Sequence, residues 1–414
     1  REVLKFDVAI IGAGASGTLT AVQAARAGLN VGLIDAGARA ARGLAYGTPY
    51  GAHLLNVPAA RMSAFPDDPD HFLRWLRGRL PDAHGGTFAP RALYGDYLAS
   101  LLIAAEVTRV GGSAVGLTDG WTVHLHDGRT VNARSVVLAL GNLPPNDPLD
   151  LGGNTPPEYI RDPWAPGASL GLDHDAPVLL IGSGLTALDI AIALRHDGHR
   201  GTIYALSRNG RLPQPHAPVT PRPLESVPFT TPHEGLRWMR KQEDWRAAID
   251  SLRPHTSAIW RSWTLAQRGS FLRHMRNLWD VHRHRYAPEM DVHLTVLRGR
   301  IVSMEEGLIV RFRPTGKDDV RELRVARAIN CTGPACDYTR IDLPLVEQMR
   351  RAGWLTPDAL RLGIETDVDG RLISHDGVVV PGLFTLGPLR RPALWESTAI
   401  PEIRGQAAAL ASKL

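Results

Sequence analysis

The sequence predicts an α/β protein in which two similar three-layer domains each contain a parallel sheet. Two observations lead to this fold class. A glycine-rich turn follows a short apolar stretch at Gly12 and again at Gly182, and a helical stretch follows each turn. The length of 414 residues is sufficient for two or three domains. The repeated order of strand, turn and helix therefore predicts that the fold is duplicated within one chain.

The first fifty residues predict a strand, a glycine turn, a helix and a second strand. Phe6–Ile11 is suited to a buried parallel strand, Thr18–Ala27 to a helix and Asn30–Ile34 to the next strand. The intervening Gly12–Gly17 (GAGASG) permits a tight turn, a close approach of the backbone to a pyrophosphate and close packing of the helix. Asp35 lies where a carboxylate accepts the ribose hydroxyls of an adenosine. The unit is typical of a Rossmann-like dinucleotide-binding domain.

The second half repeats this unit with one change. Pro177–Ile181 predicts a strand, Leu185–Arg195 a helix and Thr202–Leu206 the next strand, around the turn Gly182–Ala187 (GSGLTA). No acid follows the second strand, because Ser207-Arg208 occupies that position. A hydroxyl and a guanidinium would bind a 2′-phosphate, which favours NADPH over NADH. Alternatively, Arg208 is one more surface residue in an arginine-rich chain.

Each unit closes in a similar way. Trp121–Leu125 and Ser135–Leu140 predict a hairpin and a return strand that ends at Gly141. Leu308–Phe312 and Ala326–Asn330 do the same before Gly333. Gly382–Gly387 and a helix over Glu402–Lys413 would complete the first fold, so the second domain is inserted in the first. We expect an FAD-binding domain formed by residues 1–155 and 335–414, and an NADPH-binding domain over 156–334 with a helical insertion at about 230–290.

The composition excludes several classes of function. Of the 47 basic residues only four are lysines, and residues 233–288 carry eleven basic against five acidic side chains, so basicity is local. A pocket for a small anion fits this pattern better than nucleic acid, and no apolar run is long enough for a membrane span. No spacing of histidines with Cys or carboxylates suggests a metal site. We therefore expect a cytoplasmic protein with a small-molecule substrate and no membrane partner. The oligomeric state is not predicted.

Five longer stretches identify a resemblance that covers nearly the whole chain. They are Gly43–Thr48 (GLAYGT), His53–Ser63 (HLLNVPAARMS), Pro66–Leu76 (PDDPDHFLRWL), Trp279–Pro288 (WDVHRHRYAP) and Trp395–Arg404 (WESTAIPEIR). In these stretches the chain resembles a bacterial FAD/NAD(P)-binding family of flavoproteins with two dinucleotide-binding domains. It also resembles flavin-dependent N-hydroxylating monooxygenases, in particular the aspartate N-monooxygenases that form nitrosuccinate. The resemblance implies bound FAD, NADPH, molecular oxygen and hydroxylation of an amine nitrogen by a C4a-(hydro)peroxyflavin.

The resemblance also places candidate residues beside the flavin and the substrate. Asn56 is expected to hydrogen-bond the flavin ring, although a turn cap before Pro58 explains it equally well. Arg283 and Arg285 follow an apolar stripe that predicts one helix over residues 271–279, and they are the candidates for binding a substrate carboxylate. The alternative is a helical cap with solvated arginines. The candidate catalytic residues are Asn56, Arg283 and Arg285.

The remaining candidates are cofactor contacts. For FAD they are Gly12, Gly14, Ala15, Ser16, Gly17, Asp35, Asn56, Val57, Met62, Ser63, Gly141, Gly387, Thr398, Ala399 and Ile400. For NADPH they are Gly182, Ser183, Gly184, Thr186, Ala187, Ser207, Arg208 and His216. Residues 398–400 precede the C-terminal helix, whose N-terminus would stabilise negative charge on the reduced flavin. Pro388 stands where many such flavoproteins carry an Asp that binds the ribityl chain.

Two other functional classes stay open. Cys331 and Cys336 have the spacing of a redox disulfide, but they lie late in the chain, where Cys331 is better explained as a small buried residue. An NADPH-dependent oxidase, dehydrogenase or reductase without oxygen insertion is the first alternative. A flavin-binding sensor without turnover is the second.

Overall fold

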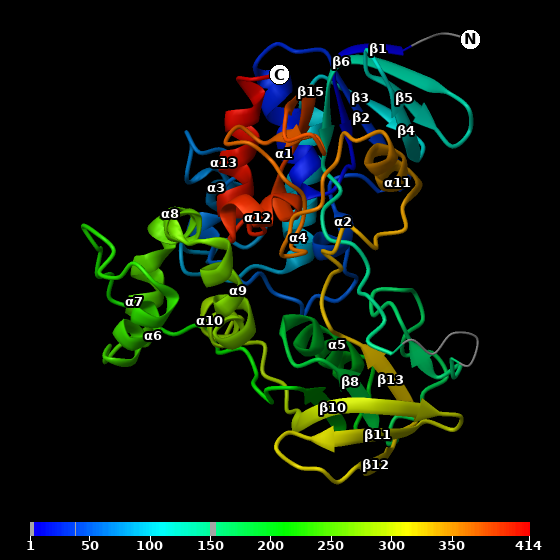
Figure 1. The fold of residues 1–414 in the computed structure, drawn as a ribbon, viewed down its shortest axis with the longest axis vertical. Coiled ribbons are helices and arrows are strands. Elements are labelled where there is room, and N and C mark those ends of the chain that lie inside the picture. The colour runs from blue at the N-terminus through cyan, green and yellow to red at the C-terminus, as the bar shows by residue number, and fades with distance from the viewer. Residues whose placement is uncertain (1–3, 38, 150–154) are drawn as a thin grey trace.

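Two separate β-sheets organise the molecule, which a computed structural model describes for residues 4–37, 39–149 and 155–414 (Figure 1). Within these ranges one sheet has eight strands and the other has seven, and each has a parallel core accompanied by helices. The predicted α/β class with two Rossmann-like domains is confirmed. No helix in the described ranges is long and apolar enough to cross a membrane.

The first sheet joins the two ends of the chain. Its order is β14-β15-β6-β1-β2-β3, with the β4–β5 hairpin attached to β6. Because β15 runs parallel to β6, the segment after the second sheet completes the first one. Alternate residues of β1 enter opposite cores, Val8 and Ile10 on one face and Ala9 and Ile11 on the other. The strands are β1 (Leu4–Ile11), β2 (Val31–Asp35), β3 (Val107–Gly111), β4 (Ala114–Thr118), β5 (Thr122–Leu125), β6 (Thr130–Leu138), β14 (Arg371–Ile373) and β15 (Val379–Thr385).

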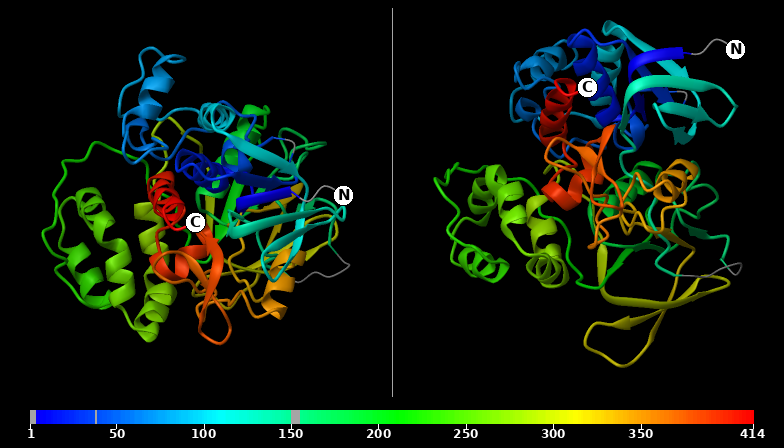
Figure 2. Two further views of the ribbon diagram at one scale, coloured as in Figure 1. Left: turned by 90° about the horizontal axis from the view of Figure 1, so that it is seen from above. Right: turned by 45° about the horizontal axis from the view of Figure 1, so that its top comes forward.

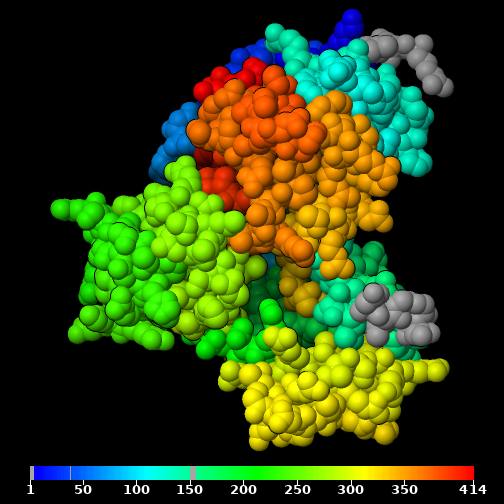
Figure 3. Space-filling model, in the orientation of Figure 1, coloured from blue at the N-terminus to red at the C-terminus, as the bar shows by residue number. Residues whose placement is uncertain are grey.

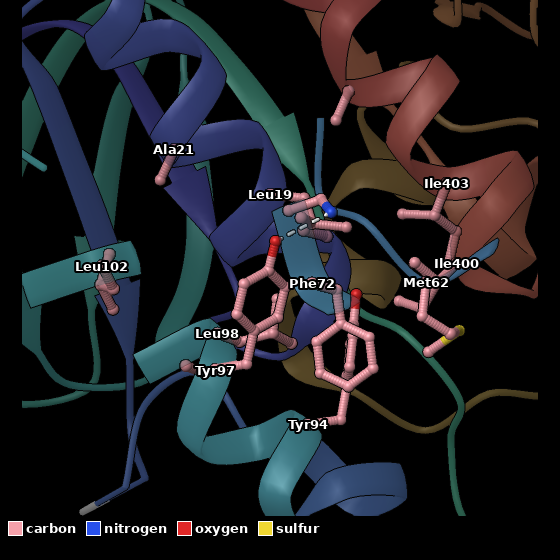
Figure 4. Close-up of a cluster of buried hydrophobic side chains, with 14 of the residues drawn as sticks. Leu19, Ala21, Met62, Phe72, Tyr94, Tyr97, Leu98, Leu102, Ile400 and Ile403 are labelled. Carbon is pink, nitrogen blue, oxygen red and sulfur yellow. Dashed lines mark hydrogen bonds between the residues drawn. The ribbon is translucent and has the colours of Figure 1, made fainter. Parts of the chain in front are cut away.

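Helices cover both faces of this sheet. On one face lie α1 (Ala15–Arg26), α4 (Arg91–Ala104) and α13 (Ile400–Ala411), and on the other lies α11 (Pro344–Arg351). Figure 4 shows the core of the first face, where aromatic rings of α4 meet Phe72 beside the start of α13. The shorter helices are α2 (Gly43–Tyr46), α3 (His71–Arg77) and α12 (Arg391–Leu394), with 3₁₀ turns η1 (Ala59–Arg61), η2 (Arg253–His255) and η3 (Gly387–Arg390).

The second sheet repeats the plan of the first. Its order is β12-β11-β10-β9-β8-β13-β7, so β13-β8-β9-β10 corresponds to β6-β1-β2-β3. The side chains of β8 also alternate between two cores, and α5 (Leu185–His196) packs on one of them. The strands are β7 (Tyr159–Ile160), β8 (Val178–Ile181), β9 (Ile203–Ser207), β10 (Thr295–Glu305), β11 (Ile309–Pro314), β12 (Arg321–Arg324) and β13 (Arg327–Asn330). The duplication predicted from the glycine turns is present.

A group of helices stands to one side of the two sheets, as the green segments of Figures 2 and 3 show. They are α6 (Pro232–Arg240), α7 (Trp245–Leu252), α8 (Thr256–Ser262), α9 (Leu265–His274) and α10 (Arg276–Arg283). Capping boxes begin α6 and α9, with Thr231 and Thr264 as the capping residues. This group is called the helical insertion below.

The prediction of one helix over residues 271–279 is wrong. The chain leaves the helical conformation at Met275 (φ −122°, ψ −22°), so the apolar stripe is divided between α9 and α10. The members of the stripe have different partners: Phe271 packs against Trp395, whereas the indole N–H of Trp279 donates to Glu396 (2.7 Å). A hydrophobic pattern alone does not distinguish one straight helix from two short helices that bury the same residues.

Candidate cofactor and substrate site

The first glycine turn leaves a free helix N-terminus at the end of β1. Gly12 has φ +107°, and a Cβ there would lie 2.3 Å from the carbonyl oxygen of Ala139. A Cβ at Gly17 would lie 1.8 Å from the carbonyl oxygen of Gly12. Both glycines are therefore required by the fold. At Gly14 the nearest atom would be 3.7 Å away, so packing does not require a glycine, and no side chain caps α1. This open turn fits a pyrophosphate on the N–H groups of α1, where Ala15 and Ser16 begin the helix.

Asp35 lies beside this turn, as the sequence predicts. The carboxylate ends β2 and accepts from the backbone N–H of Ala13 (3.5 Å) and of Gly37 (3.2 Å). Gly141 follows the neighbouring strand β6 with φ +64° and nothing within 4 Å of a hypothetical Cβ. The ends of β1, β2 and β6 thus present a carboxylate and open backbone on one edge of the sheet. This arrangement fits the adenosine part of FAD.

The second glycine turn has the same geometry. Gly182 has φ +118°, and a Cβ there would lie 2.3 Å from the carbonyl oxygen of Cys331, whereas Gly184 has nothing within 4 Å. Gly184 precedes α5, which has no side-chain cap and whose first turn contains Thr186 and the buried Ala187. The open position again fits a phosphate at a helix N-terminus.

Ser207 and Arg208 follow β9 on the same edge. The Ser207 hydroxyl lies 2.7 Å from the Ser183 hydroxyl and accepts from the Gly210 N–H (3.0 Å). Arg208 is exposed, and its guanidinium forms no ion pair within the described residues. The backbone of Arg208 is held by the Thr315 hydroxyl, which donates to its carbonyl oxygen (2.9 Å). A fixed backbone with a free guanidinium is compatible with binding of a 2′-phosphate.

The loop that contains Asn56 lies against the start of α13. The Arg404 guanidinium donates to the carbonyl oxygens of Arg61 and Ser63 (3.0 Å each) and so ties the loop to the helix. Met62 is buried beside Ile400 in the core of Figure 4. The Ser63 hydroxyl lies 2.6 Å from the Asp68 carbonyl oxygen, so it is engaged within a turn.

The N-terminus of α13 is the helix end that the resemblance implies would face the flavin. The N-cap residue is Ala399, which offers no side-chain cap, and Thr398 before it is exposed. The Gly387 N–H donates to Gln406 Oε1 (3.0 Å), so a side chain of α13 fixes the backbone before Pro388. Pro401 has no backbone N–H and the Glu402 N–H donates to the Ala399 carbonyl oxygen (3.1 Å), so this end offers the Ile400 N–H and the positive end of the helix dipole.

His216 connects the Asn56 loop to the second half of the site. Its Nε2 donates to the Asn56 carbonyl oxygen (2.8 Å), and its backbone N–H donates to the Tyr286 carbonyl oxygen (2.9 Å). Burial lowers the pKa of His216 to about 4, so the ring is neutral at neutral pH. Asn56 Oδ1 is buried without a hydrogen-bond partner in the described structure, and Val57 beside it is half-buried. The structure therefore brings Asn56, His216 and residues 283–286 together.

The two candidate arginines have different surroundings. Arg285 is buried and forms an ion pair with Asp250. Arg283 is 9% exposed and lies 3.5 Å from Glu402 Oε1, which also accepts from Arg253 at 3.0 Å. The Nε and Nη2 atoms of Arg283 have no hydrogen-bond partner in the described structure. These atoms form one side of a guanidinium, the side that binds a carboxylate through two hydrogen bonds.

Sequence analysis missed the acids of this site. Glu396 and Glu402 lie in Trp395–Arg404, one of the stretches that carry the resemblance, but the candidates from this stretch are the uncharged residues 398–400. Glu396 is buried and accepts from Trp279, and His284 Nε2 lies 3.4 Å away. Burial raises the pKa of Glu396, but the charges of His284 and Arg283 outweigh burial and hold it well below the ordinary value. Only the fold shows that Glu396 meets Trp279 and His284, whereas Glu402 meets Arg253 and Arg283.

The cysteines do not form a disulfide. Both are free; Cys331 is buried in the second sheet, and burial raises the pKa of its thiol far above the ordinary value. The Cys336 thiol lies 3.3 Å from the Arg361 carbonyl oxygen. Within the described residues no group of three or more His, Cys, Asp or Glu side chains could hold a metal ion.

The chain is similar to known proteins in part of its sequence and in its fold. Residues 9–143 match a family described as FAD-NAD(P)-binding, and no curated protein matches the sequence. L-lysine 6-monooxygenase from Pseudomonas syringae has a similar structure (TM-score 0.68, 16% identity, 99% of this chain and 98% of that one). So does the ornithine N-hydroxylase of Kutzneria sp. 744, solved with reduced FAD, NADP⁺ and L-ornithine (0.65, 16%, 99% and 98%).

A disulfide reductase shares the same fold. The bacillithiol disulfide reductase of Bacillus cereus aligns with a TM-score of 0.58 at 15% identity, over 99% of this chain and 98% of that one. At such identities the likeness concerns the fold. The chain therefore has the fold that these flavin-dependent, NAD(P)-binding oxidoreductases share, and its residues 9–143 match the FAD-NAD(P)-binding family.

Proposed function

We propose that this protein is an FAD- and NADPH-dependent monooxygenase that hydroxylates the amine nitrogen of an anionic, amino-acid-like small molecule. The observation that carries the proposal is Arg283, a buried guanidinium whose Nε and Nη2 donors form no hydrogen bond in the described structure, although Nη2 lies 3.5 Å from Glu402 Oε1. It lies beside Glu402 in the first turn of α13, the helix whose N-terminus faces the proposed flavin position. A carboxylate bound there would hold the rest of the substrate near the flavin.

The residues of this chain would bind and orient the reactants. FAD would lie on Gly14 and Asp35, and NADPH on Gly184 and Arg208. When bound, FAD supplies hydride acceptance from NADPH and activation of molecular oxygen. The neutral His216 holds the Asn56 backbone in place by its Nε2–H bond. Arg285, already paired with Asp250, would support Arg283 by adding positive charge.

Two observations support this function over disulfide reduction. The chain has only two cysteines, which are not joined, and the buried Cys331 thiol resists ionisation, so it is a poor nucleophile. Two of the similar structures described above are enzymes named for oxygenation of amino acids. Cys331→Ala with Cys336→Ala should therefore leave NADPH-dependent flavin reduction and substrate turnover unchanged. Loss of electron transfer in this double variant would instead support thiol chemistry.

The experiment is a screen of acidic and neutral amino acids for substrate-dependent NADPH oxidation, with mass spectrometry for a product heavier by one oxygen. Arg283→Ala should raise KM for a carboxylate substrate by about tenfold or more and leave NADPH-dependent flavin reduction unchanged. Arg273→Ala, an exposed arginine of α9, is the matched control and should behave as wild type. NADPH consumption that yields only hydrogen peroxide would identify an oxidase, and no flavin reduction at all would indicate a sensor.

A further inference from the structure

The helical insertion surrounds a partly open apolar cavity of about 390 Å³. It is bounded by α6 to α10 and by Trp395, and five of the ten tryptophans line it: Trp245, Trp260, Trp263, Trp279 and Trp395. No carboxylate lines the cavity. A volume of this size is within the range of small-molecule sites in proteins.

We propose that this cavity binds a flat aromatic group of the substrate, so that the substrate is an amine with an aromatic body and not a compact acidic amino acid. The inference rests on the proposed function for its amine chemistry. The aromatic binding site itself follows from the cavity.

The aromatic wall is held in a defined arrangement. Trp260 stacks on Trp395 (centroids 4.9 Å apart, planes at 25°), and Phe271 stands perpendicular to Trp395 at 5.2 Å. The indole N–H of Trp260 donates to the Pro392 carbonyl oxygen (2.8 Å), and that of Trp263 donates to the Thr230 carbonyl oxygen (3.1 Å). Aromatic rings in such fixed positions offer faces and edges to another aromatic ring.

Trp395, in this wall, combines an unusual backbone conformation with a buried donor that has no partner in the described structure. Its backbone has φ +62° and ψ −60°, a conformation that residues other than glycine rarely adopt. Its indole Nε1 is buried and has no hydrogen-bond partner in the described structure. Strained backbone that the surrounding packing maintains is concentrated at binding sites.

The cavity shares two helices with the proposed carboxylate site. In α7, Ile249 and Leu252 line the cavity, while Asp250 between them pairs with Arg285. In α10, Trp279 lines the cavity, and Arg283 four residues later reaches Glu402. The cavity and the proposed carboxylate site are therefore built on the same two helices, so a substrate that occupies both would bridge α7 and α10.

The charged side chains that line the cavity indicate whether it suits a neutral aromatic group or a cation. Aromatic cages also bind cations, but here the charged side chains that line the cavity are Arg211 and Arg240, with His282 beside Trp245. With positive residues and no carboxylate, the cavity disfavours an ammonium group. The ligand we expect is uncharged where it enters the cavity.

The test is calorimetric titration of the FAD-loaded protein with indole and with tetramethylammonium, in the absence of NADPH. Wild type should bind indole, and the ammonium ion should not compete. Leu236→Trp, which fills the cavity from α6, should weaken indole binding roughly tenfold. Leu265→Trp, at an exposed position of α9 outside the cavity, should change it less than about twofold. Met239→Trp is a second cavity-filling variant if Leu236→Trp unfolds.

Turnover separates the two proposals. Absence of indole binding to wild type, or unchanged binding in both filled variants, would overturn the aromatic site. If indole binds as expected but no aromatic amine gains oxygen, the cavity inference holds and the monooxygenase proposal fails. If aspartate gains oxygen equally well in wild type and Leu236→Trp while indole does not bind, the monooxygenase proposal holds and the cavity inference fails.

Discussion

Arg208 is the residue on which the proposed preference for NADPH depends. It follows β9 where an acid follows β2, it is exposed, and it has no ion pair within the described part of the chain. Arg208→Ala should weaken NADPH binding by about 1.5–3 kcal/mol, because a charge-assisted hydrogen bond to the 2′-phosphate is lost. NADH binding should change little. Flavin reduction measured over a range of each nucleotide gives both values, and equal losses would remove the argument for NADPH.

Glu396 gives a prediction for pH. Because its pKa in the folded protein lies below the ordinary value of 4.5, its ionised form stabilises the fold above that pH. This contribution is lost as the pH falls through the folded pKa. Glu396→Gln should therefore be less stable than wild type at neutral pH, and the difference should narrow below about pH 4.5. Urea unfolding at several pH values measures this, and a constant difference down to about pH 3 would contradict it.

At the scale of elements, the parts that repeat a short local rule could be predicted. Strands β1 and β8, the glycine turns and α5 lie where the sequence places them within one or two residues, because an apolar run and a glycine at a positive φ are local requirements. The break at Met275 could not be predicted, since it depends on Trp395 and Glu396, which are more than a hundred residues away. The cavity of the helical insertion was missed for the same reason. The number of tryptophans in this segment indicates apolar bulk, but it does not show that the side chains leave a cavity between them.

For the molecule as a whole, the sequence predicted the duplication but not what joins the two halves. The repeated motifs and the family resemblance were sufficient to predict the second sheet, its helical insertion and the segment that returns to β15. The domain boundaries remain a prediction. One of the contacts that join the two halves is an ion pair between Arg91 on α4 and Asp189 on α5, whose side chains are 10% and 7% exposed. Both oxygens of Asp189 accept from Arg91 (2.6 and 2.8 Å), and His53 Nε2 donates to the Asp189 carbonyl oxygen (2.8 Å). Residues 98 positions apart give no local signal of such a contact.

This buried pair should hold the two sheets in one relative orientation, which hydride transfer from NADPH to FAD would require under the proposed function. Arg91→Ala leaves the Asp189 carboxylate buried without its partner, so the free energy of unfolding should fall by about 3–5 kcal/mol. Arg200→Ala breaks an exposed pair with Asp175 and should cost no more than about 1 kcal/mol, which makes it the matched control.

Replacing both partners, as Arg91→Met with Asp189→Leu, removes the unpaired charge and should recover most of the lost stability. If the pair also sets the orientation, this double variant should reduce its flavin slowly with NADPH but normally with dithionite, which needs no bound nucleotide. Stopped-flow absorbance measures both rates. Wild-type reduction by NADPH in a stable double variant would show that other contacts between the two halves, such as Tyr50 with Asp197 and His216 with Asn56, hold the sheets without the ion pair. In that case the ion pair would contribute to the free energy of unfolding but not to the relative orientation of the sheets. The double variant separates these two effects because it removes both charges and leaves no buried charge unpaired.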